Sequence, residues 1–111
     1  MDVFHTNPFR SAVKKLLTAD ELAAFENFIS VRPDHGQVMP GLGGLRKVRW
    51  ARAGKGKRGR VRVIYFYAII RNAVYLIDIY AKAKAADLCP ENKRRLLRFV
   101  EELKRTLKEE E

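Results

Sequence analysis

The residues in this sequence that are best suited to chemistry are a concentrated group of cations. The whole chain has a net charge of +10. Residues 46–62 hold nine basic side chains and no acidic one, whereas basic and acidic residues nearly balance over the rest of the sequence. The nine are Arg46, Lys47, Arg49, Arg52, Lys55, Lys57, Arg58, Arg60 and Arg62. A field this concentrated attracts a polyanion, and phosphodiester backbones are the commonest such partner. The segment therefore predicts contact with a nucleic acid.

Apolar residues interrupt this basic segment, and they decide between a folded surface and a disordered tail. Most blocks of like charge are solvated and unstructured. Here Val48, Trp50, Val61 and Val63 lie among the cations, and the chain continues into the apolar run 64–67. Disordered segments lack such residues because they have no core in which to bury them. We therefore expect a structured cationic surface.

The usual catalytic constellations are missing from the sequence. Its two histidines, His5 and His35, lie neither in a nucleophile motif nor at metal-ligand spacing. The glycine-rich run 54–59 lacks the Gly-Lys-Ser/Thr ending of a nucleotide-binding loop. We therefore expect no metal and no cofactor. Any chemistry would be carried out by lysine, arginine and tyrosine side chains.

Size and composition predict one domain, residues 1–111, in a reducing compartment. A chain of 111 residues with 47% hydrophobic residues can build a single core. Its one cysteine, Cys89, excludes an internal disulfide framework and is typical of the cytoplasm. No apolar run reaches the roughly 18 residues that a membrane span requires, so we expect no membrane association.

Two helices are predicted before the basic segment. Pro8 suits the first turn of a helix, because its missing N–H would have no partner there. Thr18 and Glu21 have the spacing of a capping box, in which each side chain satisfies a backbone N–H of the other residue. That box starts a second helix, which we expect to end near Val31, before Pro33.

Strand patterns dominate the middle of the sequence, after a short β-like start at residues 3–5. Residues 45–52, 60–68 and 73–81 carry the alternation or the β-branched and aromatic content of strands. Residues 90–108 carry an apolar stripe at helical spacing. These elements predict an α+β fold with two N-terminal helices, an antiparallel sheet of three to four strands and a C-terminal helix, the helices packing against one face of the sheet.

Strand alternation sorts the charged residues onto the two faces of the predicted sheet. Residues two positions apart point to the same side, so Lys47 accompanies Arg49. Ile77 and Ile79 are expected on the side opposite Asp78. Three neighbouring strands could then join five side chains in one concave patch: Lys47, Arg49, Arg62, Tyr80 and Lys82. Alternation leaves open which face of the sheet meets the helices.

Four motifs, in this order, resemble the HigB-like branch of the RelE/ParE toxin superfamily. They are residues 41–49 (GLGGLRKVR), 54–59 (GKGKRG), 62–66 (RVIYF) and 79–82 (IYAK). With the flanking helices, the resemblance covers nearly the whole chain. It implies a small α+β toxin domain. RelE-like members enter the ribosomal A site, cut the mRNA there, and are held inactive by a cognate antitoxin.

The resemblance also implies roles for individual cations. In metal-free RNA cleavage a 2′-OH attacks the adjacent phosphate, and cationic side chains stabilise the charge that grows there. By motif, Arg62 is expected to stabilise the phosphate and Lys82 to transfer a proton, with Lys47 and Arg49 as the remaining catalytic pair. Ribosomal RNA is expected to contact Arg46, Lys55, Lys57, Arg58, Arg60 and Lys84. The expected partners are an antitoxin, the ribosome and mRNA.

Two alternatives to the nuclease remain, and the general base is unassigned. ParE-like relatives share the fold but bind DNA gyrase and cleave nothing, and they usually lack a dense cationic surface. A non-catalytic RNA-binding protein would need the cations alone. Some RelE relatives place a tyrosine after the last strand as a candidate base. Here Asp87 and Leu88 stand there, and Tyr80 is the nearest phenol. The nine cations favour the nuclease.

Overall fold

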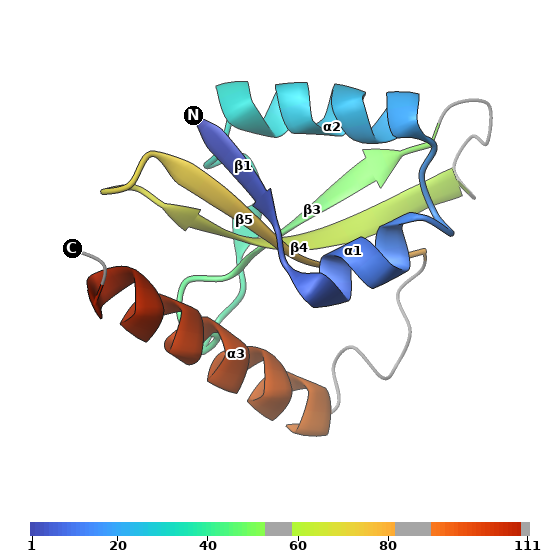
Figure 1. Cartoon of the computed structure of the whole chain (residues 1–111). Helices are drawn as coiled ribbons and strands as arrows, with labels where there is room; N and C mark the ends of the chain where they lie inside the picture. The colour runs from blue at the N-terminus through green and yellow to red at the C-terminus, as the bar shows by residue number, and fades with distance from the viewer. Residues whose placement is uncertain (53–58, 82–89, 110–111) are drawn as a thin grey trace.

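A five-stranded sheet in the order β1-β5-β4-β3-β2 forms the centre of the fold (Figure 1). The structure is a computed structural model that describes residues 1–52, 59–81 and 90–109. β3, β4 and β5 form the antiparallel meander that the sequence predicts. The strands are β1 (Asp2–His5), β2 (Gln37–Val38), β3 (Arg46–Ala51), β4 (Arg60–Ala68) and β5 (Ala73–Tyr80).

Two short strands extend the meander at its edges. β1 pairs with β5 in parallel, with Val3 opposite Val74, and β2 pairs with β3 in antiparallel. Just after β1, the Thr6 hydroxyl donates to the Leu76 carbonyl at 2.9 Å and fastens that edge. The α+β class is confirmed. The sheet, however, has five strands rather than three to four, and one of its pairs is parallel.

Three helices accompany the sheet: α1 (Asn7–Val13), α2 (Ala19–Val31) and α3 (Pro90–Glu109). α2 begins with the predicted capping box. The Thr18 hydroxyl accepts from the Glu21 amide at 3.1 Å, and the Glu21 carboxylate accepts from the Thr18 amide at 2.8 Å. Pro8 lies in the first turn of α1, as predicted. Within the described residues, none of the helices has both the length and the apolar character to cross a bilayer.

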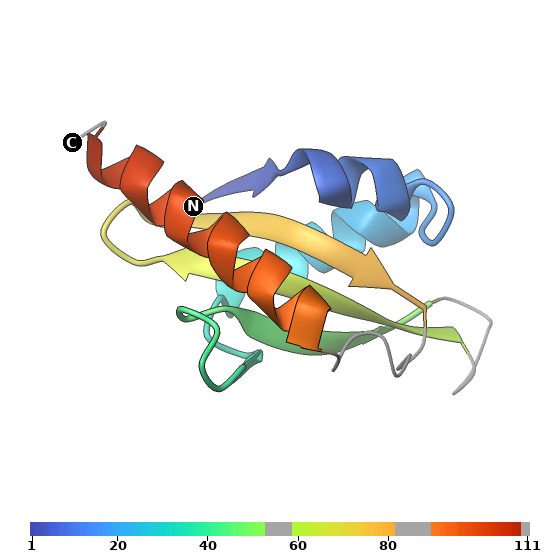
Figure 2. The same ribbon diagram turned by 90° about the horizontal axis from the view of Figure 1, so that it is seen from below.

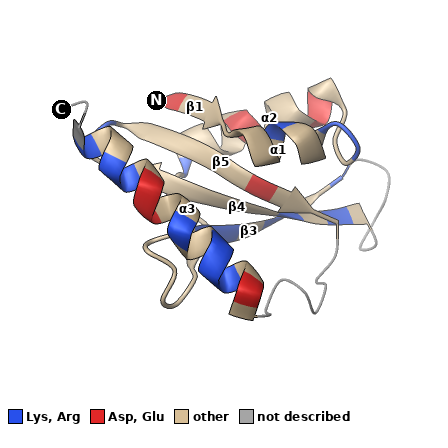
Figure 3. Cartoon of the chain, turned by 60° about the horizontal axis from the view of Figure 1, so that its bottom comes forward, with Lys and Arg blue, Asp and Glu red and all other residues tan. Residues whose placement is uncertain are grey.

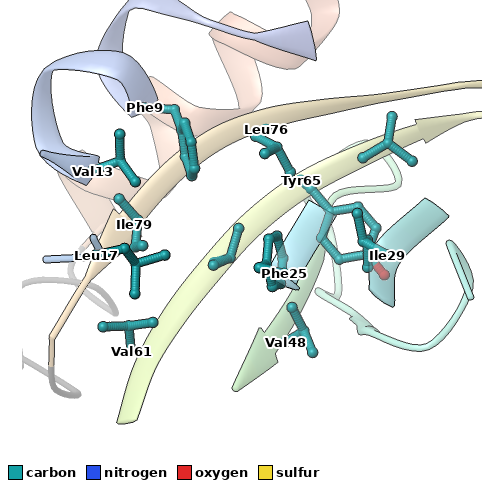
Figure 4. Packing of buried hydrophobic residues seen from close by; sticks show 12 residues of the cluster. Phe9, Val13, Leu17, Phe25, Ile29, Val48, Val61, Tyr65, Leu76 and Ile79 are labelled. Carbon is teal, nitrogen blue, oxygen red and sulfur yellow. The ribbon is translucent and has the colours of Figure 1, made fainter. Parts of the chain in front are cut away.

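Helices pack on both faces of the sheet, so the prediction that they share one face is wrong (Figures 1 and 2). The α1–α2 core, shown in Figure 4, consists of Phe9, Val13, Leu17, Phe25, Ile29, Val48, Val61, Val63, Tyr65, Val74, Leu76 and Ile79. The α3 core consists of Leu42, Leu45, Ile64, Ile77, Leu96 and Val100. Both sides of β4 supply buried residues, and a strand that is apolar on both sides needs a cover on each face.

An irregularity in β5 changes which face one of its isoleucines reaches. Ile64 lies opposite Asp78, whereas the next residue, Tyr65, lies opposite Leu76, so β5 contains one extra residue, Ile77. Ile77 therefore joins the α3 core, while Ile79 stays in the α1–α2 core. The prediction that Ile77 and Asp78 point to different faces of the sheet is wrong, because strand alternation assumes an uninterrupted pleat.

Tyr65 connects the α1–α2 core to the loop between α2 and β2. Its hydroxyl donates to the Pro33 carbonyl at 2.8 Å and accepts from the Gly36 amide at 2.8 Å. Burial raises the pKa of this hydroxyl above its ordinary value. The Arg46 guanidinium holds the same loop, because it donates to the Asp34 and Gly36 carbonyls at 3.1 and 2.8 Å. The loop is thus fixed to the sheet from two strands.

Candidate nucleic-acid interface

Three residues of the predicted patch form a row across the central strands. Arg49 of β3 lies directly opposite Arg62 of β4, and Arg62 in turn lies opposite Tyr80 of β5. Side chains opposed in this way point to the same face, with Cβ atoms about 5 Å apart. Arg49 is exposed, while Arg62 and Tyr80 are half-buried. We call Arg49, Arg62 and Tyr80 the cationic row.

The cationic row lies on the face of the sheet that α3 covers. The neighbouring row consists of Lys47, Ile64 and Asp78. Ile64 is buried in the α3 core, and Tyr80 packs against that core. Alternation leaves the choice of face open. The structure places the cationic row, and Lys47 beside it, next to the C-terminal helix rather than next to α1 and α2.

The two arginines of the cationic row have no carboxylate partner within the described ranges. Neither Arg49 nor Arg62 makes an ion pair or a side-chain hydrogen bond among residues 1–52, 59–81 and 90–109. Like charges directly opposite one another destabilise a sheet. An anion between the two guanidinium groups would relieve that repulsion, and guanidinium groups bind phosphate oxygens with paired hydrogen bonds. The row is therefore suited to a phosphate group.

Helix α3 adds a second group of cations, which the sequence analysis missed. Figure 3 shows basic residues along α3 as well as on the strands of the sheet. Glu101 and Glu102 on the same helix hide this group in a count of net charge. The sequence nevertheless indicates a cationic face on this helix, because Arg94 and Arg98 are four residues apart and lie off the apolar stripe. The four residues, all exposed and called the α3 cations below, are Lys93, Arg94, Arg95 and Arg98.

The other predicted RNA-contacting residues occupy different positions. Arg60 is exposed at the start of β4, two residues before Arg62 and so on the same face of the strand. Arg46 is half-buried, and its guanidinium binds the carbonyl groups of the α2–β2 loop. Five predicted site residues lie outside the described residues: Lys55, Lys57, Arg58, Lys82 and Lys84.

The two histidines lie away from the cationic row. His5 Nε2 is 2.5 Å from Glu26 Oε1, and its ring stacks at a tilt on Phe9 of the α1–α2 core. His35 packs edge-on against Phe28 of α2. In the part of the chain that the structure describes, no three histidine, cysteine, aspartate or glutamate side chains gather as a metal site would require.

Comparison with known proteins agrees with this architecture. Residues 1–111 match the family described as the RelE toxin of the RelE/RelB toxin-antitoxin system. The fold is similar to that of a chain in the crystal structure of the intact E. coli RelBE toxin-antitoxin complex, with a TM-score of 0.58 over 75% of this chain and 98% of that chain. The two sequences are 11% identical, so this likeness concerns the fold alone. The match over the whole sequence shows that the chain belongs to the RelE toxin family.

Proposed function

We propose that this protein is the toxin of a type II toxin–antitoxin system and that it cuts mRNA in the A site of the ribosome. The observation that carries the proposal is the cationic row, in which two arginines without carboxylate partners in the described chain face each other across the central strands. The resemblance of the motifs at residues 41–49 and 54–59 supports placing it in the HigB-like branch. The cytoplasm is the proposed compartment.

The proposed reaction is metal-independent and uses the RNA's own hydroxyl as nucleophile. The 2′-OH loses its proton and attacks the adjacent phosphorus, the bond to the 5′-oxygen breaks, and that oxygen takes up a proton. Negative charge grows on the non-bridging oxygens. Arg62 is suited to stabilise this charge, because a central strand holds it in place before the reaction begins. Arg49 and Lys47 would add positive charge from the neighbouring strand β3.

Proton transfer is proposed for the end of β5. Lys82 matches the basic residue that ends the last strand in the family motif, and it follows Tyr80 by two positions. A lysine among other cations is a suitable proton carrier near neutral pH. Tyr80 lies opposite Arg62, so its phenol belongs to the same row as the proposed phosphate site. The other cations of the region, including the α3 cations, are proposed to hold ribosomal RNA.

An antitoxin is the proposed partner that keeps the activity in check. The net charge of +10 favours a partner rich in carboxylates, because complementary charge speeds association and gives specificity. We expect that expression of this chain alone stops growth through loss of translation. Co-expression of the protein encoded by the neighbouring gene is expected to restore growth.

A cell-free translation reaction in which mRNA 5′ ends are mapped tests the proposed activity. Wild-type protein is expected to produce cuts within A-site codons, and Arg62→Ala is expected to lose them. Arg32→Ala is the matched control, because Arg32 is an exposed arginine that follows α2 on the other side of the sheet. Blocked translation without cuts, or DNA breaks that depend on gyrase, would favour a ParE-like inhibitor. RNA binding with neither effect would favour a non-catalytic binding protein.

A further inference from the structure

The turn between β4 and β5 exposes two large aliphatic side chains. Ile69 is 71% exposed, and Ile70 is 89% exposed, the highest value among the large hydrophobic residues of the described chain. The Asn72 amide donates to the Ile69 carbonyl at 3.1 Å and closes the turn. Tight turns are usually built from glycine, proline and small polar residues. Two adjacent isoleucines here indicate a surface that another molecule covers.

A surface pocket of about 600 Å³ lies beside this turn. The end of β4 and the last turns of α3 form its walls, and Phe66, Ile69, Ile70 and Leu107 supply much of its apolar lining. The Arg71 guanidinium donates to the Leu107 carbonyl, so the turn and the helix are fastened to each other. The pocket is therefore a fixed feature of the surface rather than a gap between independent segments.

Cations surround the apolar lining. Arg71, Lys104 and Lys108 line the pocket, and no acidic residue is among the described residues that do. The Lys104 ammonium lies 5.6 Å from the centre of the Phe66 ring, which keeps its charge at the pocket wall. An apolar lining with a cationic rim is complementary to a peptide segment that presents aliphatic side chains next to carboxylates.

We propose that the pocket and the Ile69–Ile70 turn, together called the hairpin pocket, bind an acidic amphipathic segment of the antitoxin. This inference rests on the proposed function, which supplies the antitoxin. A second copy of this chain fits less well, because two surfaces rich in cations would meet in a protein of net charge +10. RNA fits less well too, because the exposed aliphatic side chains of the pocket make no bonds to phosphates.

The hairpin pocket lies at the opposite end of β4 from the cationic row. Arg62 and Ile69 are seven positions apart, which corresponds to roughly 20 Å along an extended strand. A segment confined to the hairpin pocket would therefore not itself contact Arg49 or Arg62, and inhibition would come from the rest of the antitoxin. Attachment of the antitoxin and access to the phosphate site thus depend on different residues, and they can be changed separately.

The test uses the double variant Ile69→Glu/Ile70→Glu, whose new carboxylates would repel an acidic segment. Both side chains are mostly exposed, so the change removes little from the core. Val31→Glu is the matched control, because Val31 is 80% exposed at the end of α2 and lies outside the hairpin pocket. Affinity for the purified protein encoded by the neighbouring gene is measured by calorimetry. Single-turnover mRNA cleavage and circular dichroism are measured on the same samples.

The double variant is expected to bind the antitoxin at least about thirtyfold more weakly, the loss typical of a central interface residue, with cleavage and fold unchanged. The control is expected to bind as the wild type does, and Lys104→Glu is expected to slow association and flatten its salt dependence. Equal binding by wild type and double variant would overturn this inference alone. A wild-type protein that binds no such partner would overturn the proposed function as well. Loss of self-association without loss of antitoxin binding would identify a second copy as the occupant and overturn the proposal.

Discussion

Arg62 lies between Arg49 and Tyr80 in the cationic row, and this central position makes it the most informative residue to change. We predict that Arg62→Ala slows cleavage on the order of a hundredfold, the usual cost of losing one donor to a transition-state charge. Arg62→Lys should recover part of the rate, because it keeps the charge but loses the paired hydrogen bonds. Single-turnover cleavage at saturating ribosomes measures this step apart from binding. Wild-type cleavage by Arg62→Ala would reduce the row to a docking surface.

Tyr65 provides a test of how a single side chain contributes to stability. Tyr65→Phe removes the group that accepts from the Gly36 amide and donates to the Pro33 carbonyl. We predict that it lowers the free energy of unfolding by about 1–3 kcal/mol, the cost of leaving buried polar groups without a partner. Urea denaturation measures the change. Tyr67→Phe, which removes a hydroxyl with no hydrogen bond in the described chain, should cost clearly less.

The Tyr65 hydroxyl also predicts how stability changes in alkali. Burial, the largest cause, raises the pKa of this hydroxyl above its ordinary value of 10.0. The unfolded chain therefore loses the proton at a lower pH than the folded protein does. Stability from this group is complete below pH 10 and falls as the pH rises from about 10 through the folded-state pKa. Urea denaturation between pH 8 and 11 should show this decline in the wild type and a smaller one in Tyr65→Phe.

Side-chain roles differ in how far the sequence can predict them. Strand alternation and the pairing of adjacent strands predict that Arg49 and Arg62 point to the same face of the sheet. The local sequence pattern was therefore enough to predict this arrangement. The position of Arg46 depends instead on where the loop at residues 34–36 returns to the sheet. No local pattern contains that information. Arg46 was therefore predicted only as an RNA contact, although it also holds a loop in place.

Among the helices and strands, too, the features set by neighbouring residues were predicted and those set by distant contacts were not. The capping box at Thr18 and the strand at residues 60–68 were predicted correctly, because the signals lie within a few residues of each other. The parallel pairing of β1 with β5 and the packing of α3 on the second face were not predicted. Both depend on contacts between residues that are far apart in the sequence. The extra residue in β5 belongs to this second class.

A pair of glycines tests how closely α3 packs on the loop before β3. A Cβ on Gly43 would lie 2.7 Å from Val100 Cγ1, whereas a Cβ on Gly41 would meet nothing within 4 Å. Both residues have a positive φ, +66° and +72°, so an alanine is strained at either position. We predict that Gly43→Ala lowers the free energy of unfolding by about 1–3 kcal/mol more than Gly41→Ala does, the usual cost of overpacking.

Chemical denaturation of Gly43→Ala and Gly41→Ala measures this difference. Hydrogen exchange should also show a specific loss of protection in α3 for Gly43→Ala, because Val100 is the residue displaced. Equal stability of the two variants would mean that α3 moves to accommodate the alanine at position 43 without a loss in the free energy of unfolding.

For the molecule as a whole, the α3 cations extend the positive surface beyond the sheet. We predict that Arg94→Ala/Arg98→Ala weakens ribosome binding and lowers its logarithmic salt slope by about 1.5, as expected for two lost phosphate contacts. Cleavage at saturating ribosomes should stay near the wild-type rate. Arg105→Ala is the control, because the Arg105 guanidinium already pairs with Glu102 at 2.8 Å. Binding across a salt series provides the measurement, and an unchanged slope would remove α3 from the RNA interface.

The parallel pairing of β1 with β5 also determines when the sheet of a newly made chain can be completed. β1 is synthesised first, yet it cannot pair until residues 73–76 have been added. Tyr80 comes later still. Chains grow at about 5–20 residues per second, so several seconds separate the start of synthesis from completion of this edge. During that interval the nascent chain lacks the assembled sheet that aligns Arg49, Arg62 and Tyr80. On the proposed function, this order of synthesis would delay assembly of the phosphate site until β5 has been made.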